Sequence, residues 1–299
     1  MAERKTILVT GANGQLGNEM QVVSSAYPLY DFLFVTREQL PIEDDEIIAA
    51  YFNRHTIDYC VNCAAYTAVD KAETEPEKAY LVNSTAVENL AKVCKAHNTQ
   101  LIHISTDYVF DGTSVVPYSE NDPVSPVNLY GASKLAGEIS AFQNNPRSII
   151  IRTSWVYSSF GNNFVKTMLR LMKERDSINV VSDQQGSPTY AADLAAAIMQ
   201  IITRLEQSPQ LLNNSLSAPA IFNYSNKGVT TWHGFATTIK ELSGSKCIVN
   251  PITAAQYPTP AKRPGYSVMD TAKIQQTFDL KISGWKESLE ICLVKMLQA

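Results

Sequence analysis

The chain of 299 residues has no long hydrophobic run, and none of its apolar stretches approaches the ~20 residues that a membrane span needs. It also has no excess of basic residues, because 25 Lys and Arg stand against 29 Asp and Glu, a formal charge of −4. This mildly acidic balance argues against nucleic acid as a partner. The first residues show no signal-peptide pattern, so we expect a cytoplasmic protein with no membrane partner.

Cysteine and histidine are scarce. The five cysteines are an odd number in a large chain, which argues against a disulfide scaffold. Cys60 and Cys63 form a C-x-x-C pair, but the surrounding apolar run predicts a buried strand, which disfavours a redox or zinc role. His103 also lies in an apolar strand and is expected to be a hydrogen-bonded core residue. No histidine has a partner at metal-ligand spacing.

Short apolar runs alternate with amphipathic stretches through the first half of the chain. This alternation predicts a parallel sheet with helices on both faces. The expected strands are residues 6–10, 31–35, 58–63, 101–105 and 148–153, and the expected helices are 15–25, 44–54, 77–97 and 129–143.

After residue 156 the pattern loosens and proline becomes frequent. Helices are expected at 163–173, 191–204, 231–242 and 286–297, with a strand at 179–181. We therefore predict an α/β protein with a Rossmann-type doubly wound parallel sheet and a smaller mixed α/β substrate domain. Residues 1–157 with 187–208 would form the dinucleotide-binding domain, and residues 158–186 with 209–299 the smaller one.

Gly11, Gly14 and Gly17 follow the first expected strand and open a helix, in the spacing G-x-x-G-x-x-G. Such glycines allow a tight turn, a close approach of a pyrophosphate to the backbone, and close packing of helix on sheet. Free N–H groups at the helix start would bind the diphosphate. We predict a dinucleotide site at this turn, Asn13 included; a plain strand-to-helix turn is the alternative.

The second strand is followed by Thr36 and Arg37, where an NAD-preferring site usually has an acidic residue for the ribose 2′-hydroxyl. A guanidinium suits a 2′-phosphate instead. We therefore predict NADPH as the cofactor, with NADH as the second choice. The alternative is that Arg37 is a solvated loop residue.

Tyr130 and Lys134 stand four residues apart on an expected helix, so both side chains share one face. A tyrosine has a pKa near ~10, and a neighbouring lysine cation stabilises tyrosinate and brings this pKa toward the working range. Thr106 ends the strand before this helix and supplies a hydroxyl that can hold a carbonyl group. The alternative is an exposed pair of no importance.

With these features, the chain resembles the extended short-chain dehydrogenase/reductase family over nearly its whole length. The runs Ala65–Glu73 and Asp183–Thr189 are specific to one branch, the reductases of 4-keto sugar nucleotides. The other matching stretches occur across the family: Gly14–Gly17, Ser105–Gly112, Pro126–Lys134, Arg152–Tyr157 and Arg263–Pro264.

The resemblance implies reduction of the C4 ketone of a nucleotide-linked sugar. Tyr130 would protonate the developing alkoxide, Lys134 would hold the nicotinamide ribose, and Thr106 would bind the ketone oxygen. Further implied sugar contacts are Asp107 and Trp155. The cofactor contacts implied by the resemblance, besides Tyr130 and Lys134, are Gly14, Gln15, Leu16, Ala64, Ala65, Tyr66 and Thr67.

Two other functions stay open. A non-catalytic NADP-binding regulatory subunit could share the fold, although it need not keep Thr106, Tyr130 and Lys134. The second open function is that of a sugar epimerase or dehydratase. A dehydratase usually has the sequence Thr-Asp-Glu at this site, whereas Tyr108 follows Asp107 here.

Arg263 lies in the loop Pro260–Pro264, where the prolines restrict the backbone. We predict that it binds or borders the substrate diphosphate; a surface salt bridge is the alternative. Some relatives bind Mg²⁺ between subunits through glutamates. Glu19 matches one such position, but Ala191 and Ala192 stand near another, so no metal is predicted. A homodimer is compatible with the resemblance.

Overall fold

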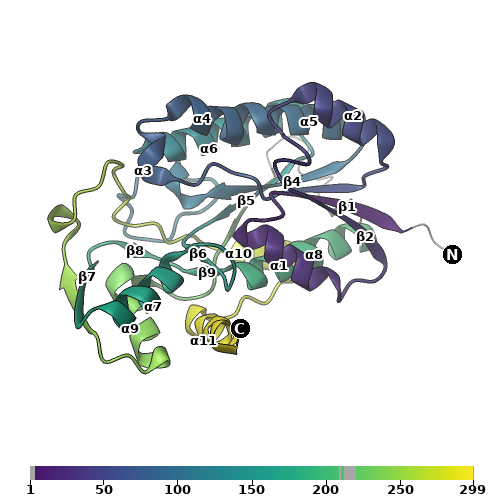
Figure 1. Cartoon of the computed structure of the whole chain (residues 1–299). Helices are drawn as coiled ribbons and strands as arrows, with labels where there is room; N and C mark the ends of the chain where they lie inside the picture. The colour runs from purple at the N-terminus through teal and green to yellow at the C-terminus, as the bar shows by residue number, and fades with distance from the viewer. Residues whose placement is uncertain (1–3, 209, 212–219, 299) are drawn as a thin grey trace.

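A six-stranded parallel sheet forms the centre of the computed structural model, which describes residues 4–208, 210–211 and 220–298 (Figure 1). The chain runs from β1 outward to β2 and returns to β3 on the other side of β1, so the doubly wound prediction is confirmed. In spatial order the strands are β10 (Ala220–Tyr224), β5 (Ile149–Thr153), β4 (Gln100–Thr106), β3 (Tyr59–Asn62), β1 (Lys5–Thr10) and β2 (Tyr30–Val35).

One face of the sheet is covered by the upper helices of Figure 1. Leu8, Cys60 and Ile150 point into this layer and pack with apolar residues of the helices. Asp44 begins one of them by accepting a hydrogen bond from the Ile47 N–H at 3.0 Å. The helices are α2 (Asp45–Arg54), α3 (Val69–Ala72), α4 (Pro76–Tyr80), α5 (Ala86–Ala96) and α6 (Leu129–Asn144).

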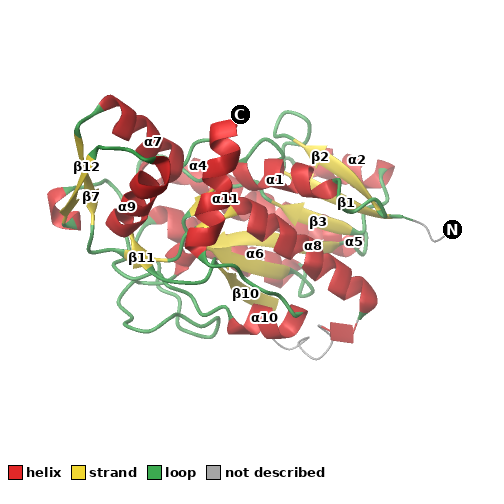
Figure 2. Cartoon of the chain, turned by 90° about the horizontal axis from the view of Figure 1, so that it is seen from below, coloured by secondary structure: helices red, strands yellow, loops and turns green. Residues whose placement is uncertain are grey.

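The other face packs against α1 (Gln15–Ser24), α8 (Ala191–Gln207) and α10 (Ala272–Phe278), as Figure 2 shows from below. Ile7, Val9 and Ile151 alternate with the residues of the first layer and face these helices. Burial on both faces explains why the central strands are continuous apolar runs. No helix of the described residues is long and apolar enough to cross a membrane.

A smaller lobe lies beside the carboxyl ends of the strands and has its own core, which includes Val165, Phe235 and Leu289. Two short strands, β6 (Val156–Tyr157) and β9 (Thr189–Tyr190), pair where the chain passes between the lobe and the main layers. The lobe contains α7 (Phe164–Glu174), β7 (Ser177–Val181), β8 (Gln185–Gly186), β11 (Thr230–Thr231), α9 (Trp232–Ser243), β12 (Ile248–Ile252) and α11 (Trp285–Gln298).

The predicted division of the chain is wrong in one part. Residues 209–299 were assigned to the smaller domain, but β10 is the sixth strand of the main sheet and α10 covers its lower face. The strand contains Ala220, Ile221 and Phe222, an apolar run that completes the edge next to β5. Residue 209, residues 212–219 and residue 299 of that segment lie outside the described residues.

The single helix predicted over residues 77–97 is also interrupted. A π-helical turn, Leu81–Thr85, separates α4 from α5. Its extra residue brings Asn83 into the protein, where the side chain donates to the Ser133 hydroxyl at 2.9 Å and to the Tyr66 carbonyl at 3.1 Å. Asn83 therefore ties the loop after β3 to α6, a contact between distant segments that sequence periodicity does not report.

Candidate active site

The glycine turn lies where the sequence predicts it, between β1 and α1. Gly11 has φ +63°, and a Cβ added there would lie 2.8 Å from the Ala64 nitrogen. A Cβ on Gly17 would lie 2.3 Å from the Gly11 carbonyl oxygen, so the turn and the helix meet too closely for a side chain. No side chain of the described residues caps α1, whose first N–H groups remain available to an anion.

Arg37 borders a cavity of about 230 Å³ beside this turn. Its guanidinium is mostly exposed and donates from Nε to Glu43 at 2.9 Å. No sequence pattern indicated Glu43, because it lies directly before the helix expected at residues 44–54. The cavity is lined by Thr10, Gly11, Asn13, Gly14, Arg37, Leu40, Ile42, Glu43, Cys63, Ala64, Ala65, Tyr66 and Val82.

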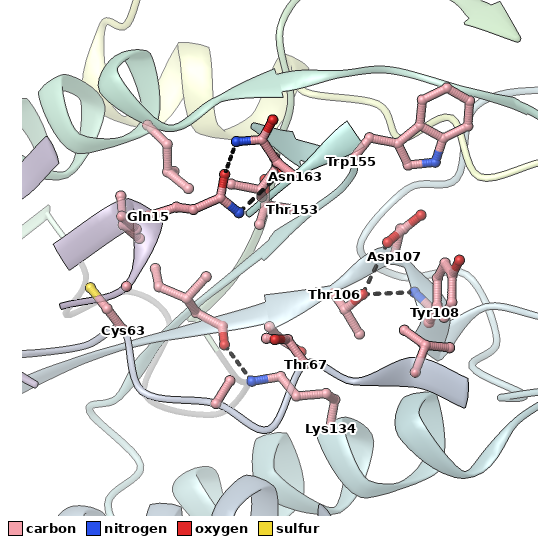
Figure 3. A pocket seen from close by; sticks show the side chains of 18 of the residues that line it. Gln15, Cys63, Thr67, Thr106, Asp107, Tyr108, Lys134, Thr153, Trp155 and Asn163 are labelled. Carbon is pink, nitrogen blue, oxygen red and sulfur yellow. Dashed lines mark hydrogen bonds between the residues drawn. The ribbon is translucent and has the colours of Figure 1, made fainter. Parts of the chain in front are cut away.

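A larger cavity of about 670 Å³ opens along the carboxyl ends of β1, β3, β4 and β5 (Figure 3). Gln15 and Asn163 close one side through a 3.0 Å hydrogen bond, and Thr106 and Lys134 reach in from other elements. The residues that line it include Gly14, Gln15, Leu16, Cys63, Ala65, Thr67, Thr106, Asp107, Tyr108, Tyr130, Lys134, Thr153, Trp155 and Trp232. The three predicted catalytic residues are thus brought together with the glycine turn.

Tyr130 is the second residue of α6, which begins where the Asn128 side chain accepts the Gly131 N–H at 2.8 Å. Its ring packs edge-on against Tyr108, with ring centres 5.7 Å apart. The pKa of Tyr130 is raised to about 12, mainly by burial and less by the charge of Asp107, while the Thr106 hydroxyl opposes the rise. At neutral pH Tyr130 is therefore protonated and can donate.

Lys134 lies one turn further along α6 and is 2% exposed. Its ammonium donates to the Ile104 carbonyl at 2.7 Å. Burial lowers the pKa of Lys134 to about 8, against the opposing effect of Glu138 on the same helix. Glu138 is itself bound by the buried guanidinium of Arg152, with Nε–Oε1 at 2.9 Å and Nη2–Oε2 at 2.7 Å.

Thr106 and Asp107 turn the chain from β4 into the cavity. The Thr106 hydroxyl accepts the Tyr108 N–H at 3.2 Å and donates to Asp107 Oδ1 at 3.0 Å. Burial raises the pKa of Asp107 to about 7, while hydrogen bonds from Ser267 and Thr106 oppose the rise. The carboxyl group can therefore carry a proton near neutral pH.

Trp155 has φ +47°, a left-handed conformation that is uncommon for a large residue. Its ring stacks on Trp232, with centres 3.6 Å apart and planes 10° apart. Trp232 also lines a neighbouring cavity of about 740 Å³ in the smaller lobe, so the stacked pair stands between two cavities. No sequence pattern indicated Trp232, because its partner is 77 positions away in the chain.

Arg263 lines this second cavity together with Lys262 and with the apolar side chains of Phe164, Leu171 and Tyr257. Its guanidinium binds Asp70 at both oxygens, at 3.0 and 2.8 Å. The structure therefore contains both features weighed from the sequence, the salt bridge and the place beside a cavity. Within the described residues, Lys262 makes no ion pair.

The remaining predictions concern Glu19, metal binding, the cysteines and His103. Glu19 is 1% exposed and accepts a hydrogen bond from the Ser158 hydroxyl at 2.6 Å. Among the described residues, no three His, Cys, Asp or Glu side chains are grouped to hold a metal ion. All five cysteines are free. His103 is fully buried and hydrogen-bonded, as predicted.

The sheet order, the glycine turn and the Tyr130–Lys134 pair at the carboxyl ends of the strands define an oxidoreductase of the short-chain type. The chain belongs to the family described as RmlD substrate binding domain, whose model matches residues 5–298.

Named relatives agree with this assignment. A dTDP-4-dehydrorhamnose reductase of Sinorhizobium fredii is 41% identical over 286 residues, which cover 94% of each chain. The crystal structure of a dTDP-4-dehydrorhamnose reductase from Clostridium acetobutylicum is 38% identical, with TM-score 0.89, and covers 98% of this chain and 100% of that one. One from Bacillus anthracis, in complex with NADP, is 35% identical, with TM-score 0.89 and the same coverage.

Proposed function

We propose that this protein reduces the C4 ketone of dTDP-4-dehydro-L-rhamnose with NADPH and forms dTDP-L-rhamnose, a step in polysaccharide biosynthesis. The observation that carries the proposal is the cavity that joins Thr106, Tyr130 and Lys134 to the glycine turn. The relatives named above support the substrate, and the NADP complex among them supports the cofactor.

The residues at the sheet edge fit a dinucleotide. Gly11 and Gly17 have no room for a Cβ, and the uncapped start of α1 offers N–H groups to a diphosphate. Arg37 borders the cavity beyond the turn, where its guanidinium would bind a 2′-phosphate. Ala64, Ala65 and Tyr66 line the same cavity, and Thr67 lines the larger one. NADPH, when bound, supplies the hydride.

The proton comes from the protein. The Thr106 hydroxyl turns its proton from Asp107 to the ketone oxygen, and Tyr130 donates its phenolic proton to that oxygen as negative charge develops there. The ammonium of Lys134 then stabilises the tyrosinate, which burial alone would disfavour. The hydrogen bond to the Ile104 carbonyl holds the Lys134 ammonium in the cavity that Tyr130 also lines.

The two neighbouring cavities divide the substrate between them. The sugar would lie in the catalytic cavity against Asp107 and Trp155, and the nucleoside diphosphate in the lobe cavity. Apolar walls there suit a thymine ring, and Lys262 and Arg263 meet the diphosphate charge. For this contact Arg263 must share its guanidinium with, or release it from, Asp70.

A reductase assay across dTDP-, UDP- and GDP-linked 4-keto-6-deoxy sugars, with NADPH and NADH, tests the proposal. We expect stoichiometric oxidation of NADPH with the dTDP sugar and, from deuterated NADPH, one deuterium at C4 of the product. An epimerase or dehydratase would return its cofactor unchanged, and a regulatory subunit would show no turnover. Tyr130→Phe is the matched control, since it keeps the ring and removes the proton donor.

The compartment and the assembly are part of the same proposal. A biosynthetic NADPH-dependent enzyme acts in the cytoplasm, and cell fractionation tests this. A homodimer is the expected assembly, which sedimentation analysis would detect as about twice the chain mass of 33.0 kDa.

A further inference from the structure

A row of polar side chains crosses three neighbouring strands inside the otherwise apolar sheet. Thr10 on β1 is in register with Asn62 on β3, and Asn62 is in register with His103 on β4. The three side chains are at most 1% exposed. The Thr10 hydroxyl donates to Asn62 Oδ1 at 2.7 Å, and Asn62 Nδ2 lies 3.0 Å from His103 Nδ1. The row ends at Lys134, whose Nζ lies 3.5 Å from His103 Nε2.

The orientation of the Asn62 amide is fixed by the backbone. The Ala64 N–H can only donate, and it lies 3.2 Å from Asn62 Oδ1. The oxygen therefore faces Ala64 and the Thr10 hydroxyl, and the NH₂ group faces His103. Because this NH₂ donates, His103 Nδ1 must accept and carries no proton.

The position of the ring proton follows from this. Burial and the nearby lysine both lower the pKa of His103 well below its usual value, so the ring is neutral at working pH. A neutral imidazole has one N–H. With Nδ1 accepting from Asn62, the proton is on Nε2 and points at the amine of Lys134.

We propose that His103 is a positioning residue that sets the proton affinity of Lys134, because its Nε2–H favours the neutral amine over the ammonium. An N–H directed at an ammonium opposes another donor, whereas a neutral amine can accept it. This interaction limits the pH range in which Lys134 supports the Tyr130 tyrosinate. The proposal about His103 rests on the proposed function only where it predicts a change in the kinetics of the reduction.

Other titratable groups around Lys134 do not replace this effect. Glu138 on α6 favours the ammonium, but Arg152 of β5 and the Ser105 hydroxyl already bind its carboxylate. Tyr130, Asp107, Tyr108 and Cys63 line the same cavity, and burial raises the pKa of each. The two phenols and the thiol are therefore neutral at working pH, and Asp107 is at most partly ionised. His103 differs from them because its Nε2, oriented by Asn62, lies 3.5 Å from Lys134 Nζ itself.

Nitrogen NMR of the protein labelled with ¹⁵N-histidine tests the tautomer directly. The chain has only four histidines, so a His103→Gln variant assigns the signals. We expect a protonated Nε2 and an unprotonated Nδ1, with and without NADP⁺, and an Nε2 shift that titrates at alkaline pH. In Lys134→Met that titration should disappear. A proton on Nδ1, or a titration that persists without Lys134, would overturn the proposal about His103. Neither result would contradict the proposed reductase function.

Asn62→Asp tests the effect on catalysis. A carboxylate at position 62 accepts from His103 Nδ1–H, so Nε2 becomes an acceptor for the ammonium. The alkaline limb of the kcat profile should then move upward by about one pH unit, a tenfold rise in the proton affinity of Lys134. The matched control Asn145→Asp makes the same change at another buried asparagine, at the C-terminal end of α6 and about 16 Å along the helix from Lys134, and should not move the limb. A lower kcat with an unmoved limb in Asn62→Asp would reduce His103 to a structural role. If this variant does not fold, the NMR result decides alone.

Discussion

Asp107→Asn should make the stability of the protein less dependent on pH. Burial raises the pKa of Asp107 from 3.8 to about 7 in the folded protein, whereas the unfolded chain keeps the ordinary value. Between these two values the folded protein binds a proton that the unfolded chain does not. The free energy of unfolding of the wild type therefore falls as pH rises through this window.

The size of the effect follows from the two pKa values. A rise from 3.8 to about 7 corresponds to at most about 4 kcal/mol of stability, present below pH ~4 and lost by pH ~8. An asparagine cannot ionise, so the variant does not lose this stability as pH rises. Any constant cost of the new NH₂ group moves the whole curve of the variant without changing its slope.

Urea unfolding of both proteins between pH 4 and 8, followed by circular dichroism, measures this difference. The stability of Asp107→Asn relative to wild type should rise with pH and level off above the folded pKa. Asp111→Asn is the matched control, because hydrogen bonds from Thr113 and Tyr118 hold the pKa of that exposed carboxyl below its usual value. Its difference from wild type should be almost the same at every pH in this range, because a carboxyl with a lowered pKa titrates below pH ~4. A difference for Asp107→Asn that is the same at every pH would refute the reasoning.

Four kinetic predictions test the proposed site. Tyr130→Phe should lower kcat by about 10²–10⁴-fold while NADPH still binds, because only the proton donor is lost; near-normal turnover would contradict the mechanism. Arg37→Asp should shift the ratio of kcat/KM for the two cofactors toward NADH. Glu43→Gln should lower KM for NADPH but not for NADH, since it frees Arg37 and removes a charge that repels the 2′-phosphate. An unchanged ratio in both would mean that neither residue reaches the ribose. Arg263→Ala should raise KM for the sugar nucleotide several-fold and leave NADPH affinity intact; an unchanged KM, or a loss of NADPH binding, would show that this loop is elsewhere in the complex.

The order of elements in the first half could be predicted because each signal is local. The run Ile7–Val9, buried on both faces, identifies a central parallel strand, and Gly11 and Gly17 identify the turn after it. Tyr130 and Lys134 share a face because a helix repeats every 3.6 residues, whatever surrounds it. The interrupted helix at Leu81–Thr85 escaped prediction, because the partners of Asn83 come from two other segments.

Residues close together in the chain account for the class of fold, the glycine turn and the Tyr130–Lys134 pair, so these could be predicted without a structure. Their surroundings depend on how distant segments pack. In the folded chain β10 joins the main sheet, Arg263 forms an ion pair with Asp70, and Trp232 stacks on Trp155. These are contacts between side chains far apart in the chain, and their geometry is set by how the layers pack rather than by any periodic pattern.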